Sequence, residues 1–149
     1  MRARLTVRPF RLSDLDRILQ MEHASFGNDA YDRNLFAELF HKCGELFLVG
    51  ERRLRVCGYI VTCIRGDRAE LVSIAVDPAA RGKGAGSALL ASTLHRLKRR
   101  SVRRFGLMVR LSNTTARAFY ETYGFRKART VRGYYEDGED GLLMSKDLT

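Results

Sequence analysis

The chain has 149 residues, a length that favours one domain with a substantial core. Its apolar content of 45% is ordinary for a globular protein, and the sequence contains neither a run of about 18 apolar residues nor the apolar stretch of a signal peptide. We therefore expect a single domain over residues 1–149, a cytoplasmic location and no membrane partner.

The formal net charge of +10 requires an explanation. Part of this charge lies in Arg96–Arg104, a stretch expected to end a helix and enter the next strand. One interpretation is a solvated face whose cations complement the helix C-terminus. The other is a surface for ribosomal RNA or another polyanion. Because no aromatic platform or nucleic-acid-binding motif accompanies the stretch, a nucleic-acid partner is not required.

The cysteines predict neither a disulfide framework nor a metal site. Cys43, Cys57 and Cys63 are odd in number, and none of them forms a Cys-x-x-Cys pair. We therefore expect three reduced, structural thiols and no metal.

The first elements are a short strand and an amphipathic helix. Leu5–Arg8 is expected to be the strand, and Ser13–Asp16 has the N-cap and early acid of a helix start. The helix is expected to run to about residue 26, with these apolar side chains facing inward: Leu15, Ile18, Leu19 and Phe26. Glu22 shares this face, so we expect its carboxylate either to be paired or to line a cavity.

The following elements alternate as in a mixed α/β or α+β domain. A loop, Gly27–Asp32, precedes a short helix, Asn34–His41. Further strands are expected at Leu46–Glu51, Val56–Ile64, Ala69–Val76, Phe105–Val109, Phe125–Arg132 and Leu142–Lys146. Two more helices are expected. One follows the loop after the strand that ends at Val76, and the other is capped by Asn113. The order is βααβββαβαββ, with a central mixed sheet.

The run from Val76 to Leu90, VDPAARGKGAGSALL, joins an apolar strand to a helix through a glycine-rich loop. Free backbone N–H groups and the dipole at the start of a helix favour an anion there. Glycines let the backbone approach a ligand closely, and Arg81 and Lys83 add full charges. The loop therefore predicts a phosphate or pyrophosphate ligand.

Two common nucleotide-binding loops do not fit this run. A Walker A loop counted from Gly82 would need glycine where Ser87 stands. A dinucleotide-binding loop would need glycine at Ser87 or at Leu89, depending on where the count begins. The pattern that remains is Arg-x-x-Gly-x-Gly after a strand that ends in Ala-Val-Asp-Pro.

Three segments resemble the GNAT acetyltransferase superfamily. SIAVDPAARGKGAGSALL resembles its acetyl-CoA pyrophosphate loop, and VRLSNTTARAFYETYGF resembles its Asn-x-x-Ala-x-x-x-Tyr-x-x-x-Gly-Phe helix signature. RGYYEDGEDGLLM, near the C-terminus, resembles the RimI-like and archaeal N-terminal acetyltransferases. The resemblance covers nearly the whole chain. It implies the GNAT fold, a mostly antiparallel mixed sheet of about seven strands with about four helices.

The resemblance also implies acetyl-CoA as the cofactor and a set of binding residues. The pyrophosphate would be bound by the loop, whose residues are Arg81, Gly82, Lys83, Gly84, Ala85, Gly86 and Ser87. Ile74 and Val76 would offer backbone hydrogen bonds to the pantetheine arm, and Asn113 would hydrogen-bond the same arm. Four aromatic side chains would shape the peptide entrance: Phe26, Tyr31, Tyr134 and Tyr135. CoA is itself polyanionic, so a basic cofactor face needs no second partner.

Acetyl transfer from a thioester to an amine needs a base for the amine, donors for the oxyanion and an acid for the thiolate. The resemblance implies that Tyr120 lies near the thioester sulfur. A phenol with a pKa near 10 can supply a proton to a departing thiolate, so Tyr120 is the candidate acid.

The base departs from the family pattern. RimI-like proteins carry a glutamate near the end of the strand before the Asn-bearing helix, and here the aligned residue is Met108, which cannot accept a proton. Glu70 is the substitute, because the histone-acetylating branch has its basic glutamate at the equivalent offset before the loop. Strand alternation places Glu70 on one face with apolar side chains, which predicts a raised pKa. Glu22 and water are the other candidates.

The missing glutamate bears on the acceptor. At pH 7 roughly a tenth of an α-amine is neutral, against roughly one in 2,500 for a lysine side chain. We therefore favour a protein or peptide N-terminus as the acceptor, with a ribosomal protein as one candidate. Two alternatives stay open, a small cationic amine held by the acidic turn Glu136–Asp140 and a non-catalytic acyl-CoA-binding module. The sequence is compatible with a monomer or a homodimer.

Overall fold

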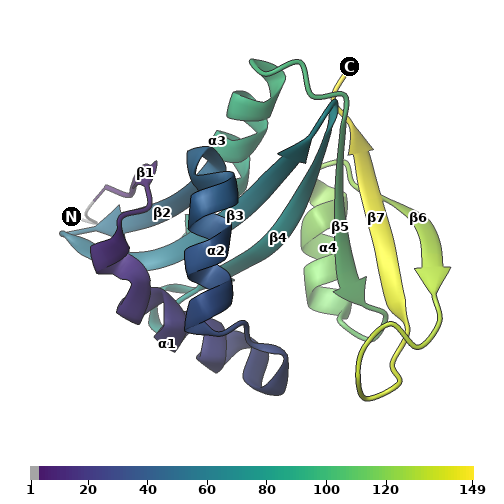
Figure 1. Cartoon of the computed structure of the whole chain (residues 1–149), viewed down its shortest axis with the longest axis horizontal. Coiled ribbons are helices and arrows are strands. Elements are labelled where there is room, and N and C mark those ends of the chain that lie inside the picture. Colours follow the sequence, from purple (N-terminus) through teal and green to yellow (C-terminus); the bar gives the residue numbers. More distant parts are fainter. Residues whose placement is uncertain (1–3) are drawn as a thin grey trace. The chain divides into compact units, whose positions relative to one another are not determined.

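The computed structural model describes residues 4–149 of the chain. Within that range, seven strands and four α-helices follow the predicted order (Figure 1). The strands are β1 (Thr6–Pro9), β2 (Phe47–Arg52), β3 (Arg55–Arg65), β4 (Arg68–Val76), β5 (Arg104–Arg110), β6 (Arg126–Val131) and β7 (Gly141–Asp147). The helices are α1 (Leu15–Phe26), α2 (Arg33–Cys43), α3 (Ala85–Lys98) and α4 (Thr114–Thr122). None of these described helices has the length and apolar character needed to cross a membrane.

The strands form one mixed sheet in the order β1-β2-β3-β4-β5-β7-β6. The pairs β1–β2, β2–β3, β5–β7 and β6–β7 are antiparallel. β4 and β5 are parallel, in a register that runs from Arg68 opposite Arg104 to Glu70 opposite Gly106. The predicted fold class is therefore confirmed.

The chain divides into two compact units. Unit 1 comprises the described residues up to Cys63 together with Val72–Arg100, and unit 2 comprises Ile64–Leu71 and Ser101–Thr149. Unit 1 contains the glycine loop, and unit 2 contains the helix with the Asn113 and Tyr120 signature.

In unit 1, helices cover both faces of the strands. The α1–α2 face is an apolar core that draws on α1, α2, β2 and β3, and its fully buried members include Ile18, Met21, Phe36, Phe47, Val49, Tyr59 and Val61. α3 packs on the other face, where Leu89 lies over Gly50 and Gly58, a pair opposite each other in β2 and β3. An added Cβ at Gly58 would be 3.1 Å from Leu89 Cδ1, so glycine is required for this close approach.

In unit 2, α4 packs against the strands β5, β6 and β7 through aromatic side chains. The rings of Phe105 and Phe125 lie 5.4 Å apart, and the ring of Tyr120 lies 5.7 Å from Phe125. All three side chains are buried. This packing fixes the position of Tyr120 within unit 2.

The predicted start of the first helix is confirmed, since Asp14 is the N-cap of α1 and Asp16 lies in its first turn, but one prediction about this helix is wrong. A 3-10 turn, Leu12–Asp14, precedes α1, and the Asp14 carboxylate accepts there from the N–H of Arg11 at 2.8 Å. Asp14 is buried, and two hydrogen bonds from Arg8 compensate the burial of its carboxylate. Phe26 was expected to face inward, but it ends α1 and is 36% exposed.

The prediction of three reduced thiols is also wrong. Cys43 and Cys63 form a disulfide, with their Cα atoms 5.0 Å apart, and Cys57 is a buried free thiol. Cys43 is the last residue of α2, and Cys63 lies in β3. Because α2 packs along β3, a sequence separation of 20 residues becomes a short distance. The disulfide ties the end of α2 to the sheet of unit 1.

Candidate active site

The strand leading into the glycine loop is anchored at Asp77. Its backbone N–H donates to the carbonyl of Cys57 at 2.8 Å, and its carboxylate accepts from the N–H of Ala79 at 3.1 Å. Arg17 of α1 forms an ion pair with this carboxylate and also donates to the carbonyl of Val56 at 3.0 Å. The hydrogen bond from Arg17 lowers the pKa of Asp77, so the anchor stays charged at neutral pH.

The N-terminus of α3 presents backbone N–H groups to the loop. Gly84, at the N-cap, has a left-handed φ of 86°, and no side chain in the described part of the chain caps the helix. Gly82 is also left-handed, with a φ of 78°. A Cβ added at either glycine would meet nothing within 4 Å, so the loop is open. An open and uncapped helix start is the arrangement that binds anions, and it fits the pyrophosphate predicted for Gly82–Ser87.

The two charged residues of the loop differ in their contacts. Arg81 donates to the carbonyl of Val76 at 3.2 Å and to Ser25 Oγ at 3.1 Å, so its guanidinium ties the loop to β4 and to the end of α1. The side chain of Lys83 is exposed, while its carbonyl accepts from Arg52 at 3.4 Å. The backbone N–H groups and Lys83 therefore remain the stronger candidates for the pyrophosphate.

Ile74 and Val76 lie on β4 beyond the register that β4 shares with β5, and both are half-buried. Their backbone groups are therefore not used in that register. The carbonyl of Val76 already accepts one hydrogen bond from Arg81. Binding of a pantetheine arm by these two residues stays a prediction.

In unit 2, Asn113 is the N-cap of α4, as predicted. Its side-chain oxygen accepts from the backbone N–H of Ala116 at 3.1 Å. The NH2 group of the same side chain has no partner among the described residues, so it is the part of Asn113 that can donate to a ligand.

Tyr120 is a buried phenol on the same helix, 7% exposed. Burial, with a smaller contribution from Tyr135, raises its pKa above the usual value of about 10. Its hydroxyl has no hydrogen-bond partner within residues 4–149. The hydroxyl itself is not among the fully buried unpaired atoms of the described residues, so its donor is available for a bound molecule.

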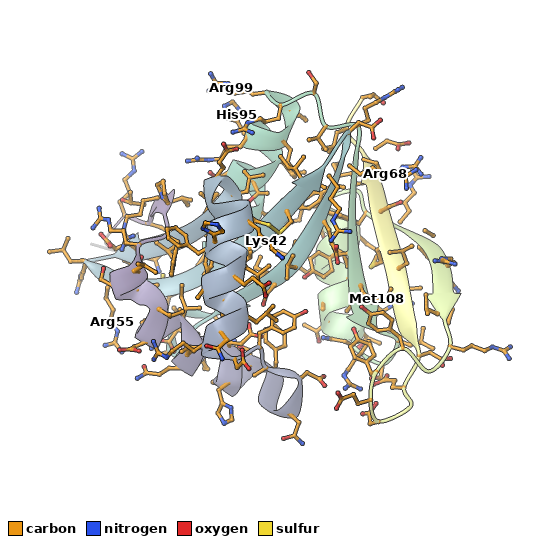
Figure 2. The ribbon with its side chains drawn as sticks, viewed as in Figure 1. Lys42, Arg55, Arg68, His95, Arg99 and Met108 are labelled. Carbon is orange, nitrogen blue, oxygen red and sulfur yellow. A yellow bond between two sulfur atoms is a disulfide. The ribbon has the colours of Figure 1, made fainter. Side chains whose placement is uncertain are left out.

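The candidate bases differ in their surroundings. Glu70 is exposed on β4, where the buried side chains belong to the opposite face: Ala69, Leu71, Ser73 and Ala75. Glu70 shares its face with half-buried apolar residues further along the strand, but it lies near the exposed start of β4 and its own side chain is open to solvent. Met108 lies on β5 and is half-buried (Figure 2). Glu22 is buried in unit 1 and its carboxylate is hydrogen-bonded, so the predicted pairing is confirmed.

The predicted acceptor residues fall into two pairs. In unit 1, Phe26 and Tyr31 flank a short turn and are each 36% exposed. In unit 2, Tyr134 and Tyr135 contact each other with ring centroids 5.0 Å apart, and Tyr134 is 51% exposed. Both pairs thus offer aromatic surface to solvent.

Arg110, which sequence reasoning missed, organises the acidic turn beside these tyrosines. Its guanidinium lies 4.2 Å from the ring centroid of Tyr135 and donates to Asp137 and Glu139, each at 2.8 Å. Hydrogen bonds from Ser112, and then from Arg110, lower the pKa of Glu139 to about 2. Asp140 accepts from a backbone N–H at 2.9 Å. Three carboxylates of the predicted acidic groove are therefore already engaged.

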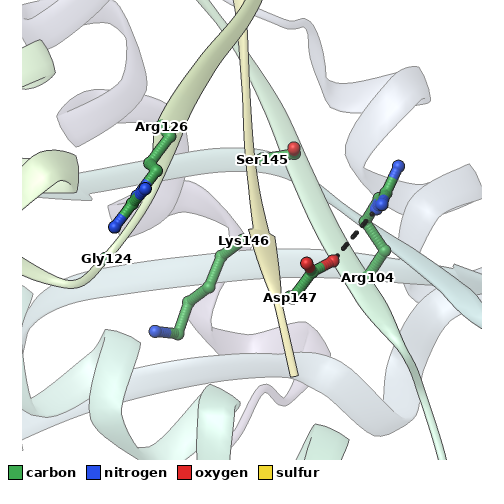
Figure 3. A pocket seen from close by; sticks show the side chains of 6 residues that line it. All are labelled: Arg104, Gly124, Arg126, Ser145, Lys146 and Asp147. Atoms are coloured by element: carbon green, nitrogen blue, oxygen red, sulfur yellow. Dashed lines mark hydrogen bonds and ion pairs between the residues drawn. The ribbon is translucent and has the colours of Figure 1, made fainter. Parts of the chain in front are cut away.

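The basic residues are distributed over the surfaces of both units. His95 and Arg99 lie at the C-terminal end of α3, where cations complement the helix dipole (Figure 2). In unit 2, a hollow of about 390 Å³ is lined by Arg104, Gly124, Arg126, Ser145, Lys146 and Asp147 (Figure 3). Arg104 donates to Asp147 there at 3.3 Å. None of the predicted site residues lines this hollow, and a polyanion surface stays a prediction.

Comparisons with known proteins agree with this geometry. The model of the acetyltransferase (GNAT) family matches residues 12–125. An N-alpha-acetyltransferase of Saccharolobus solfataricus is 31% identical over 156 residues, covering 96% of this chain and 93% of that protein. The ribosomal-protein-S18-alanine N-acetyltransferase of Escherichia coli has a similar structure, with a TM-score of 0.86, 30% identity, and coverage of 98% of this chain and 95% of that one.

A third similar structure is Naa20 of Chaetomium thermophilum in complex with a bisubstrate analogue. Its TM-score is 0.87 at 27% identity, covering 95% of this chain and 86% of that one. The chain belongs to the GNAT acetyltransferase family. It is an N-acetyltransferase that uses acetyl-CoA, as the glycine loop and the α4 signature indicated.

Replacing Gly84 by alanine should weaken use of acetyl-CoA. An alanine at a φ of 86° costs about 1 kcal/mol and would shift the loop backbone. We expect the KM for acetyl-CoA to rise about tenfold, since a tenfold change corresponds to a similar energy. Gly66→Ala is the matched control, because Gly66 has a φ of 62°, equally open surroundings and a position in the β3–β4 turn. Equal effects of both substitutions on the KM for acetyl-CoA would contradict the assignment of the Gly82–Ser87 loop to acetyl-CoA binding.

Replacing Tyr120 by phenylalanine should lower kcat by about 100-fold, the size of effect usual for the loss of one hydrogen-bond donor to a developing charge. The ring packing against Phe125 stays, so the melting temperature and the KM for acetyl-CoA should change little. Tyr123→Phe, at the C-cap of the same helix, is the control. Because the pKa of Tyr120 is raised, its hydroxyl stays protonated up to pH 10, and its titration should not lower wild-type kcat below that pH. A Tyr120→Phe variant with wild-type kcat would contradict the role.

Proposed function

We propose that this enzyme acetylates the N-terminal α-amino group of a protein or peptide. The observation that carries the proposal is the acidic turn of unit 2, where Asp137, Glu139 and Asp140 are engaged by Arg110 and by backbone N–H groups. A small cationic amine would need free carboxylates, and of the four in this turn only Glu136, two residues along the chain from the exposed Tyr134, has no such contact among the described residues. The relatives named as N-alpha-acetyltransferase and S18-alanine N-acetyltransferase support the same class of acceptor.

The proposed acetyl-CoA site draws on backbone groups at the start of α3 and on two side chains. Acetyl-CoA supplies an activated acetyl group as a thioester. The uncapped N–H groups at the start of α3 and the charge of Lys83 would hold its pyrophosphate. Asn113 would donate its NH2 group to the pantetheine arm while its oxygen keeps α4 capped.

Tyr120 would act on the leaving thiolate mainly as a hydrogen-bond donor. A thiol has a pKa of about 8.5 and an ordinary phenol about 10, and burial raises the pKa of Tyr120 further. Full proton transfer from this phenol to a thiolate is therefore unfavourable, whereas a hydrogen bond to the developing charge is favourable.

Glu70 is the proposed proton acceptor for the amine, with water as the alternative. Its exposed carboxylate can pass the proton to solvent, and Met108 offers no lone pair of comparable basicity. We place the reaction in the cytoplasm, treat residues 1–149 as one catalytic domain, and include a ribosomal protein among the acceptors to be tested. The named S18-alanine relative is the reason for that choice.

Mass spectrometry with acetyl-CoA and three acceptors tests the proposal. The acceptors are a lysine-free peptide that begins with alanine, an N-terminally blocked peptide with one lysine, and spermidine. We expect acetylation of the first peptide at its α-amine and little product from the others. Exclusive modification of lysine or spermidine would refute the proposal. Tight acetyl-CoA binding without any product would favour the non-catalytic module.

Glu70→Gln in the same assay separates the two routes for the proton. If Glu70 is the base, kcat/KM for the alanine peptide should fall at least tenfold at pH 7. The loss should shrink as pH rises towards 8.5, because more of the α-amine is then neutral. Asp67→Asn, in the turn before β4, is the control for a lost surface charge. An unchanged rate in Glu70→Gln would assign proton removal to water.

A further inference from the structure

Glu22 of α1 is a buried carboxylate that joins three other segments of unit 1. The residue is 1% exposed. Its Oε1 accepts hydrogen bonds from the hydroxyl of Tyr59 on β3 and from Ser73 Oγ on β4, the latter at 2.8 Å. Its Oε2 accepts from the backbone N–H of Tyr31, between α1 and α2, at 3.0 Å. Glu22 therefore links the sheet to the segment that follows its own helix.

The three donors explain how a carboxylate can be buried here. An unpaired buried charge is costly, whereas hydrogen bonds to a charged group are short and strong. Burial, with a further contribution from Glu22, raises the pKa of Tyr59, so the phenol remains a donor to the carboxylate. Because its oxygens are engaged and shielded from solvent, Glu22 is poorly suited to be the base that removes the proton of the amine.

The segment bound by Glu22 is the one predicted to face the acceptor. Residues 26–31 contain a single 3-10 turn, Gly27–Asp29, closed by a hydrogen bond from the N–H of Ala30 to the carbonyl of Gly27 at 3.1 Å. Gly27 has a left-handed φ of 52° with nothing within 4 Å of an added Cβ. Phe26 and Tyr31, at the two ends, are both partly exposed. The bond to Glu22 ties the far end of this segment to the core.

We propose that Glu22 is a positioning residue for the acceptor. It holds the backbone of Tyr31, and with it the aromatic side chains of the Phe26–Tyr31 segment, in the conformation that binds the incoming amine-bearing chain. The inference rests on the proposed function for the identity of the acceptor. It assigns to Glu22 a role in acceptor binding and none in proton removal.

Glutamate is the side chain that this arrangement requires. A carboxylate offers lone pairs on both oxygens and no donor, which suits three donors. In Glu22→Gln one oxygen becomes an NH2 group, which could donate to the two hydroxyls while the other oxygen still accepts from the Tyr31 N–H. Glu22→Met keeps a similar volume and offers no oxygen, so it removes the Tyr31 bond with little change in packing.

Steady-state kinetics of Glu22→Met with the alanine peptide and acetyl-CoA provide the test. We expect the KM for the peptide to rise at least tenfold, the KM for acetyl-CoA to stay within about twofold, and the pH profile of kcat to keep its shape. Hydrogen exchange of the Tyr31 amide should accelerate in the free enzyme. Ser73→Ala removes a donor to Oε1 and leaves the Tyr31 bond in place, so it should raise the peptide KM less.

Three results would overturn the proposal. An equal rise of both KM values would indicate a general structural role, and an unchanged peptide KM alongside faster exchange would show that the segment does not bind the acceptor. A collapse of kcat with an altered pH profile would make Glu22 a base. If Glu22→Met does not fold, Glu22→Gln is measured instead. Its peptide KM should rise only together with faster exchange of the Tyr31 amide, and a change in one without the other would overturn the proposal.

The acceptor assay keeps this proposal separate from the proposed function. If the wild-type enzyme acetylates only the lysine peptide, the N-terminal function fails. The KM comparison is then made with the lysine peptide, and a selective rise in its KM would still support positioning by Glu22.

Discussion

The close approach of α3 to β2 and β3 is the constraint on which the proposed acetyl-CoA site at the start of α3 depends. Leu89, in the second turn of α3, lies over Gly50 and Gly58, and a Cβ at Gly58 would come within 3.1 Å of both Leu89 and the carbonyl of Ala75. Once Leu89 is fixed, the start of the helix is fixed too, one turn earlier along the same axis. The direction of the free N–H groups is therefore set by apolar packing within unit 1. The charges of the loop add to a geometry that glycines and a leucine already define.

Carboxylates hold aromatic segments in place in each unit by accepting from backbone N–H groups. In unit 1, buried Glu22 binds the N–H of Tyr31, and in unit 2, Glu139 binds the N–H of Ser112 while Arg110 connects it to Tyr135. The two differ in solvent exposure, because Glu22 is buried and Glu139 is partly exposed. The pKa of Glu139 is about 2, so its contribution to folding stability is present above the ordinary pKa of about 4.3 and is lost only as pH falls towards 2.

The order of elements could be predicted because hydrophobic period and cap residues are local signals. Asn113 and the loop from Gly82 to Ser87 were identified in the same way. The disulfide of Cys43 and Cys63 could not be, since it depends on how α2 lies along β3. The partners of Glu22 lie 37 and 51 residues away in the sequence, so periodicity placed this side chain on the inner face but could not name its donors. The exposure of Glu70 was missed because strand alternation assigns a side chain to a face and does not say how exposed that face is near the start of the strand.

The methionine at position 108 makes chemical sense if the acceptor is an α-amine. Met108 is packed so that a Cβ at Gly141 would lie 2.8 Å from its sulfur, and the site therefore has an apolar contact where the RimI-like pattern has a carboxylate. The neutral fraction at pH 7 of an α-amine exceeds that of a lysine by roughly 250-fold, or about 3.3 kcal/mol. A general base contributes about 100- to 10,000-fold, so the intrinsic acidity of an α-ammonium recovers much of what a lost base would supply. Without a base to remove its proton, a lysine acceptor would stay almost entirely protonated at pH 7. The absence of a glutamate at position 108 therefore favours an α-amine over a lysine side chain as the acceptor.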